Sequence, residues 1–377
     1  MSSILLPFVF SLGILVPAQV ASTHAPAGMA GQPENQFEHL AQAASLERQK
    51  GEDVAAIDLY QKALQLKPDW PEGLWYQSTL LYENERFPEA SLYLRRFLAL
   101  APENGYAWAL LGMAEFQTRD YDRALNHLQQ SLVLGLGDNG KMVKVATFTT
   151  AILLTRSEHF DESLNLLFSR VASGDPIDSL VEPLGLAALR IPVLPAEIPA
   201  GRRQMVHLAG AAVLALEAQH FREAEARFTE LKDSYSSEPG VHFLVGAYLL
   251  GVHPDDGIDE LKRELEISPS HVTARLRLAA EFLKRQDTKQ GISYAQQALQ
   301  LEPNNGLAHR LLGEGMLASG DPKSGITEME TARAAMPDSL QIHWDLFRAY
   351  TSTGRLEDAT REKSEIERIN KLDAPHQ

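Results

Sequence analysis

The stretch "PEASLYLRRFLALAPENGYAWALLG" (residues 88–112) has apolar residues at the i, i+3, i+4 and i+7 spacing of an amphipathic helix, but the pattern breaks at Pro102 and restarts after Asn104. The same arrangement occurs earlier, in "AIDLYQKALQLKPDWPEGLWYQ" (residues 56–77), where the break falls at Pro68. The two prolines are 34 residues apart, which indicates a repeated structural unit.

A small residue recurs with the same period. It lies twelve residues before each of the prolines at 68, 102, 269, 303 and 337, and its successive steps are 34, 34, 39, 61, 33, 34, 34 and 34 residues. The series is Ala56, Ala90, Ala124, Ser163, Ala224, Gly257, Gly291, Gly325 and Ala359. Because a larger side chain would push two closely crossing helices apart, these positions predict the contact inside a helical hairpin. The proline then ends each hairpin, so that the next hairpin can stack beside it.

This unit resembles the tetratricopeptide repeat, a 34-residue helical hairpin with conserved bulky, small, alanine and proline positions. In residues 105–138 the matching side chains are Trp108, Gly112, Tyr121, Ala124 and Leu128; in residues 306–339 they are His309, Gly313, Met316, Gly325, Met329, Ala332 and Pro337. Nine units begin near residues 37, 71, 105, 144, 205, 238, 272, 306 and 340. The resemblance implies an all-α fold, a right-handed superhelical solenoid of helix-turn-helix repeats.

The 61-residue step interrupts the array. It contains residues 172–204, where we expect one helix near residues 178–189 and then a stretch with Pro192, Pro195 and Pro199 that cannot remain helical. This Pro-rich connector separates a four-unit block (residues 37–171) from a five-unit block (residues 205–371), which is followed by a short tail (residues 372–377). The connector could be a rigid spacer, a bend in the solenoid or a strap across its groove.

The first residues predict export. Residues 1–33 have no charged side chain, and their apolar core, residues 4–16, fits a signal peptide but is shorter than the roughly 20 residues that a membrane-spanning helix needs. Small residues allow cleavage after Ala18 or Ala21, so we expect a signal peptide over residues 1–21 and a flexible linker over residues 22–36. The expected location is periplasmic or secreted. An uncleaved anchor, which would be the only membrane contact, and a buried N-terminal segment are the alternatives.

Composition and motifs argue against several classes of function. The formal net charge of −15 is unsuited to nucleic acid, and the absence of cysteine excludes disulfides and thiolate zinc sites. "GLGDNGKM" (residues 135–142) resembles a phosphate-binding loop, but Met142 replaces the hydroxyl residue that Mg²⁺ requires, and a helical pattern precedes it; a helix end with Asp138 capping the next helix explains it. His309 and His343 fall at a packing position of the repeat. We expect no enzyme activity, no cofactor and no metal.

In the tetratricopeptide family, the first helix of each hairpin lines a concave groove, with positions 2, 5, 6, 9, 12 and 13 turned toward a bound partner. Carried over to this chain, the candidate partner-binding residues of the first block are Trp75, Tyr76, Tyr82, Tyr106, Phe116 and Phe148. Those of the second block are Arg277, Arg310 and Arg348. The aromatic rings could instead pack against one another, the connector or the N-terminal tail, and the arginines could form local ion pairs with Glu314 or Asp345.

The leading interpretation is a non-enzymatic scaffold that binds a peptide or partner helix of another protein in its groove, in the cell envelope or outside the cell. The alternative is an accessory or regulatory subunit of an envelope enzyme or assembly machine that uses the arginines for an acidic ligand. Self-assembly through the N-terminal end is a third possibility. The sequence gives neither the oligomeric state nor the identity of a partner.

Overall fold

The computed structural model describes residues 31–372 except residues 138 and 175. The predicted signal peptide and residues 373–377 of the tail lie outside the described residues. The described chain forms nineteen α-helices and one short 3-10 helix, η1 (Pro195–Glu197), so the predicted all-α class is confirmed. No described helix is long and apolar enough to cross a membrane.

The chain consists of two compact units, and the boundary between them lies between Ser179 and Leu180. The first contains four antiparallel helical hairpins. Its helices are α1 (Gly31–Lys50), α2 (Asp53–Leu66), α3 (Pro71–Glu83), α4 (Phe87–Leu100), α5 (Gly105–Gln117), α6 (Tyr121–Leu134), α7 (Gly140–Arg156) and α8 (Phe160–Ala172). Because α1 begins at Gly31, the last six residues of the expected linker are helical.

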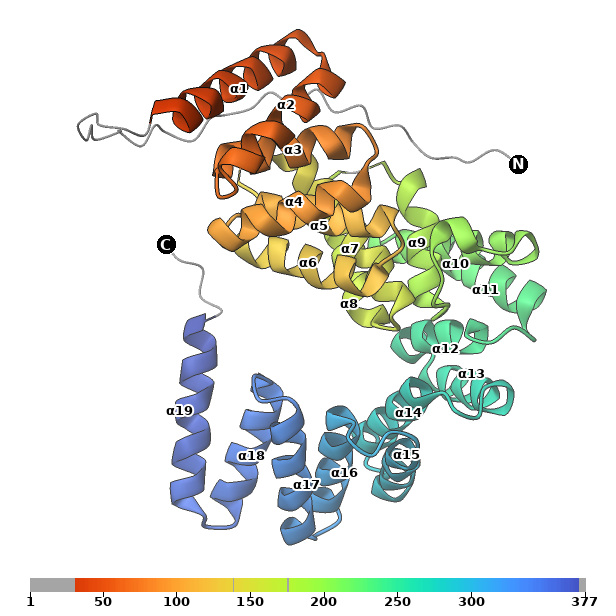
Figure 1. The fold of residues 1–377 in the computed structure, drawn as a ribbon. Coiled ribbons are helices and arrows are strands. Elements are labelled where there is room, and N and C mark those ends of the chain that lie inside the picture. The colour runs from red at the N-terminus through yellow and green to blue at the C-terminus, as the bar shows by residue number, and fades with distance from the viewer. Residues whose placement is uncertain (1–30, 138, 175, 373–377) are drawn as a thin grey trace. The chain divides into compact units, whose positions relative to one another are not determined.

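The second unit contains the connector and five more hairpins, of which α16–α17 and α18–α19 are seen stacked side by side in Figure 1. Helix α9 (Asp178–Ala188) begins two residues before the division. The other helices are α10 (Ala200–Glu217), α11 (Phe221–Tyr235), α12 (Val241–Val252), α13 (Pro254–Ile267), α14 (Val272–Lys284), α15 (Thr288–Leu301), α16 (Gly306–Ala318), α17 (Pro322–Ala335), α18 (Leu340–Ser352) and α19 (Leu356–Leu372).

The recurrent small residues lie where the two helices of a hairpin cross. A Cβ atom on Gly313 would lie 2.7 Å from the carbonyl oxygen of Gly325, and one on Gly325 would lie 2.8 Å from the carbonyl oxygen of Gly313. In the first unit, a Cβ on Gly112 would lie 3.0 Å from the carbonyl oxygen of Ala124. The steric explanation for the 34-residue period is therefore confirmed, since almost any side chain at these glycines would separate the backbones.

The turn inside eight of the nine described hairpins contains one residue with positive φ, usually the second residue after the first helix. Glycine is favoured there, but five turns hold another residue. The positions are Gly51, Glu85, Arg119, Glu158, Gln219, Gln286, Gly320 and Gly354. Between α12 and α13 only His253 intervenes, at φ −138°, so this hairpin lacks the left-handed residue. That missing turn residue explains the single 33-residue step of the sequence.

Contacts between neighbouring hairpins place the first helix of each hairpin on the more tightly curved side. First helices of consecutive hairpins contact each other directly. This holds for α5 with α7, α12 with α14, α14 with α16, and α16 with α18. Among the described residues, no two consecutive second helices are in comparable contact. Within each unit, the first helices therefore form the inner face of a curved stack and the second helices form its outer face.

The connector is part of the hydrophobic core of the second unit. Helix α9 crosses α10 so closely that a Cβ on Gly185 would lie 1.9 Å from the carbonyl oxygen of Val206, and one on Gly210 would lie 1.8 Å from that of Val181. Leu194 in the Pro-rich stretch is also buried. The prolines allow only the short helix η1 in this stretch. Helix α10 then starts at Ala200, five residues before Met205, where the repeat pattern predicts the start of the unit.

Candidate partner-binding surfaces

Six aromatic side chains of the first unit, here called the aromatic face, lie on the inner helices α3, α5 and α7, and all of them are half-buried. They are the predicted residues Trp75, Tyr76, Tyr82, Tyr106, Phe116 and Phe148. Half-burial distinguishes them from the core leucines of the same helices, such as Leu74 and Leu111, which are fully buried.

Trp75, Tyr82 and Tyr106 lie together. The Trp75 ring packs edge-on against Tyr106, with 5.7 Å between the ring centroids. It is tilted against the buried Phe97, with 5.3 Å between the centroids. These contacts connect α3 to α4 and α5. Burial raises the pKa of Tyr82 to about 12, with a further contribution from neighbouring Tyr106. The inner side of α3 and α5 therefore presents a cluster of rings that is anchored in the core and partly open to solvent.

The other three aromatic residues make separate contacts. Tyr76 packs against Tyr60 of α2 at 5.9 Å, and the Arg48 guanidinium lies over its ring at 3.8 Å. Phe116 packs against Tyr121 in its own hairpin at 5.7 Å, and Phe148 lies half-buried on α7. Packing against other rings, one of the alternatives weighed from the sequence, thus accounts for part of the surface of Trp75, Tyr76, Tyr106 and Phe116.

Two of the three predicted arginines share one carboxylate. Arg310 of α16 lies 3.3 Å from Asp345 of α18 and 3.4 Å from Glu314. Arg348 also pairs with Asp345, whose side chain is only 8% exposed, and Gln341 donates a hydrogen bond to it at 2.9 Å. These are the local ion pairs that the sequence offered as the alternative to ligand binding.

Arg277 of α14 lies in a different cluster. Its guanidinium and that of Arg190 stand over the Phe243 ring, at 5.5 Å and 5.0 Å from the centroid. His271, the N-cap residue of α14, packs against the same ring at 4.5 Å. Burial, together with the neighbouring guanidiniums of Arg190, Arg275 and Arg277, lowers the pKa of His271 to about 4. The predicted arginine site is therefore divided between two places.

Trp344 of α18 was missed by the sequence analysis. Its side chain is 46% exposed and its ring packs edge-on against Phe347 at 5.8 Å. It occupies position 5 of its repeat, the same position as Trp75 and Phe148 in theirs. The rule that selected the aromatic face would have found it, had that rule been applied to the second block as well as the first.

Comparison with known families supports this hairpin architecture. Residues 77–139 match the family model described as tetratricopeptide repeat. The fold is an all-α solenoid of paired helices like that of tetratricopeptide repeats. Domains of this family are generally protein–protein interaction scaffolds and are typically non-enzymatic. No curated protein sequence matches the chain.

Solved structures of MamA are similar to part of the chain. "MamA RS-1 ArsTM double mutant" is 16% identical and covers 46% of this chain and 97% of its own, with a TM-score of 0.42. "MamA 41-end from Desulfovibrio magneticus RS-1" is 18% identical and covers 45% and 95%, with a TM-score of 0.39. Similarity at this level says nothing about function.

The histidines at position 4 of the repeat have a structural role. His343 contacts Glu362 of α19 through Nδ1 at 2.5 Å and the Pro337 carbonyl through Nε2 at 2.8 Å. His309 contacts the Pro303 carbonyl through Nε2 in the same way, at 2.9 Å. Trp108 donates its indole N–H to the carbonyl of Pro102 at 2.7 Å. Each of these side chains ties a tetratricopeptide hairpin to the one before it. Among the described residues, no group of three or more His, Asp and Glu is arranged to hold a metal ion.

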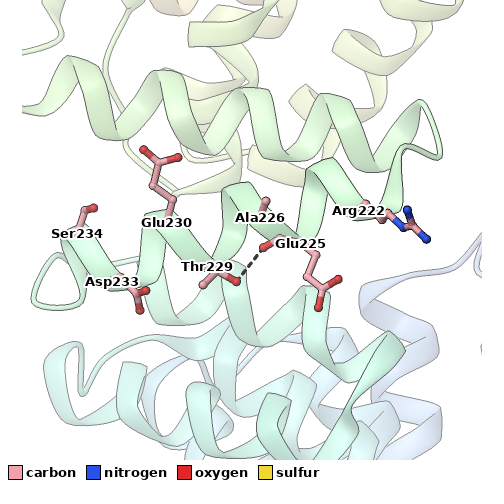
Figure 2. Close-up of a pocket in the computed structure, with 7 residues that line it drawn as sticks. All are labelled: Arg222, Glu225, Ala226, Thr229, Glu230, Asp233 and Ser234. Atoms are coloured by element: carbon pink, nitrogen blue, oxygen red, sulfur yellow. Dashed lines mark hydrogen bonds between the residues drawn. The ribbon is translucent and has the colours of Figure 1, made fainter.

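Two other features lack the geometry of a ligand site. Figure 2 shows a shallow depression whose seven lining residues, from Arg222 to Ser234, all come from the single helix α11, with Thr229 donating a hydrogen bond to the Glu225 carbonyl at 2.9 Å. In the loop that resembles a phosphate-binding motif, Gly135 has φ 82° at the end of α6, and the Asn139 side chain caps α7 by accepting from the Met142 N–H at 3.1 Å. The cap expected at Asp138 lies outside the described residues.

Proposed function

We propose that this protein is a non-enzymatic scaffold that binds a peptide or helix of another protein on the inner face of its tetratricopeptide hairpins. Recognition would depend on shape and on ring stacking, without any chemical step. We also propose, from the uncharged, apolar N-terminal segment, that it acts in the cell envelope or outside the cell.

The aromatic face is the observation that carries the proposal. Large rings that are held rigidly by the core on one side and open on the other lose little conformational entropy when a partner covers them. Trp75 and Tyr106 combine these properties, because Phe97 supports the Trp75 ring while both rings retain exposed surface.

The alternative, an accessory or regulatory subunit that holds an acidic ligand with Arg277, Arg310 and Arg348, has weaker support in its original form. Arg310 and Arg348 are occupied by Asp345, and Arg277 belongs to the separate cluster around Phe243.

Affinity purification from the native cells tests the scaffold proposal, with wild type compared with a Trp75→Ala/Tyr106→Ala variant. A matched control is Phe221→Ala, since Phe221 is a 60% exposed aromatic residue at the start of the outer helix α11. We expect a protein that co-purifies with wild type and with Phe221→Ala and is lost with the double variant, while circular dichroism shows the variant still helical. Equal recovery with all three would show that the aromatic face serves packing only.

A further inference from the structure

The inner helices of the last three hairpins have an excess of positive charge in an otherwise acidic protein. Helices α14, α16 and α18 contain five Lys or Arg residues and three Asp or Glu residues. Over the five hairpins of the second unit, the inner helices contain seven basic and four acidic residues, the outer helices contain twelve basic and seventeen acidic residues, and the whole chain has a formal net charge of −15. The charge of the second unit is therefore sorted by face.

Burial increases this difference. The carboxylates of Asp345 and Glu281 are 8% and 7% exposed, and each is held by cationic neighbours. Glu314 is more open but faces Arg310 at 3.4 Å. The cations Arg277, Lys284 and Arg348, in contrast, are exposed. An approaching partner would meet positive groups first, because the compensating carboxylates lie beneath them.

Exposed apolar side chains lie among these cations. Trp344 precedes Arg348 by four residues, so both project from the same side of α18, and Phe347 supports the Trp344 ring. On the neighbouring inner helix α16, Leu307 is 39% exposed. We call the set Lys284, Leu307, Trp344 and Arg348 the basic face.

We propose that the basic face binds an acidic peptide segment of a partner protein, in which an apolar side chain packs on Trp344 and flanking carboxylates meet Arg348 and Lys284. This rests on the proposed scaffold function and names the partner chemistry for the second unit. A basic segment would bring like charges against the exposed cations, whereas an acidic one places opposite charges next to them. Arg348 can change partner at low cost, because Asp345 keeps its contacts with Arg310 and Gln341.

The test uses the full-length protein and three synthetic peptides. The first is Glu-Glu-Leu-Glu repeated three times. In the second peptide Gln replaces every Glu, and in the third Lys replaces every Glu. Titration calorimetry at about 50 mM and about 500 mM NaCl measures their dissociation constants. We expect the Glu peptide to bind at least tenfold more tightly than the Gln peptide and to weaken at the higher salt, where exposed charges are screened. The Lys peptide should not bind.

Two variants locate the site. Trp344→Ala should weaken binding of the Glu peptide about tenfold and Arg348→Gln about three- to fivefold, as expected for an aromatic anchor and an exposed charge. The matched control is Arg361→Gln on α19, because Arg361 pairs with Asp358 three residues earlier, as Arg348 does with Asp345, and is 74% exposed compared with 68%.

The proposal is overturned if the Gln peptide binds as tightly as the Glu peptide, if no peptide binds at low salt, or if Arg361→Gln weakens binding as much as Arg348→Gln. The two variants are also tested with a single-stranded oligonucleotide as the probe. If they weaken its binding as much as they weaken binding of the Glu peptide, the face binds polyanions in general and the proposal is also rejected. Because these experiments leave the aromatic face unchanged, they can fail while partner capture through Trp75 and Tyr106 succeeds.

Discussion

The inner helices α3 and α5 of the first unit and α16 and α18 of the second occupy equivalent places in their hairpins but present different chemistry. On α3 and α5 the rings are half-buried and the exposed charged residues are Glu72 and Glu83. On α16 and α18 the large ring, Trp344, is exposed, and a guanidinium lies one turn away. Because the small and bulky core positions set the packing of the hairpins, the residues at the inner positions can differ between repeats.

The largest effect is expected from the helix crossing that exists only in the second unit. Gly210→Ala should lower the free energy of unfolding of that unit by about 3 kcal/mol, since the new Cβ would overlap the Val181 carbonyl of α9. Chemical denaturation followed by circular dichroism measures the change. Gly201→Ala in the same helix is the control: its Cβ would meet nothing within 4 Å, so stability should stay equal or rise by up to about 1 kcal/mol.

The ion-pair network of the second inner face should be the next most sensitive. Asp345→Ala would leave the mostly buried Arg310 guanidinium with only the more exposed Glu314, and we expect a loss of about 2–3 kcal/mol in the free energy of unfolding. Glu314→Ala should change it by less than about 0.5 kcal/mol, because that carboxylate is 46% exposed. Similar losses in the two variants would mean that Asp345 is not the centre of this network.

Acid should destabilise the second unit through His271. Its pKa is lowered from 6.5 to about 4 in the folded chain, so between these values the unfolded chain binds a proton that the folded chain does not. Stability is unaffected above about pH 6.5 and falls as the pH drops from 6.5 to 4, by about 2–3 kcal/mol in all.

His271→Asn sharpens the comparison of the units, because Asn104 and Asn305 cap α5 and α16 just as His271 caps α14. The variant keeps the capping acceptor and removes the titrating group. Unfolding midpoints measured from pH 7 to pH 4 should fall less steeply in this variant than in wild type. An unchanged slope would show that other groups are responsible.

The smallest effects are expected at the hairpin turns. Glu85→Gly in the first unit and Gln286→Gly in the second should each raise stability by about 0.5 kcal/mol, because glycine tolerates φ values of 59° and 63° without strain. Gly320→Ala should have the opposite sign and cost about 1 kcal/mol. Thermal unfolding midpoints of the three variants would be compared with wild type.

Sequence reasoning predicted the hairpins well because their requirements are local. The small residues at the helix crossings, such as Gly313 and Gly325, follow from the steric limits of two packed backbones and recur with a fixed period. The packing role of His309 and His343 could be deduced from the same register.

The surfaces were harder to predict because they depend on contacts between repeats. The sequence offered the ion pair between Arg310 and Asp345 only as an alternative to ligand binding, and no periodic rule states that Arg277 would lie beside Arg190 of the connector. The burial of the connector through Gly185 and Gly210 is likewise a tertiary contact without a sequence period.

Parallel affinity purification of three full-length variants tests the central claim, that the inner faces of this solenoid bind protein partners. The variants are Trp75→Ala/Tyr106→Ala on the aromatic face, Trp344→Ala/Arg348→Gln on the basic face, and Phe221→Ala/Arg361→Gln on outer helices. We predict that the outer-helix variant retains the partners of wild type, while at least one inner-face variant loses a partner and remains folded. Recovery of the same proteins with all three variants would contradict the claim.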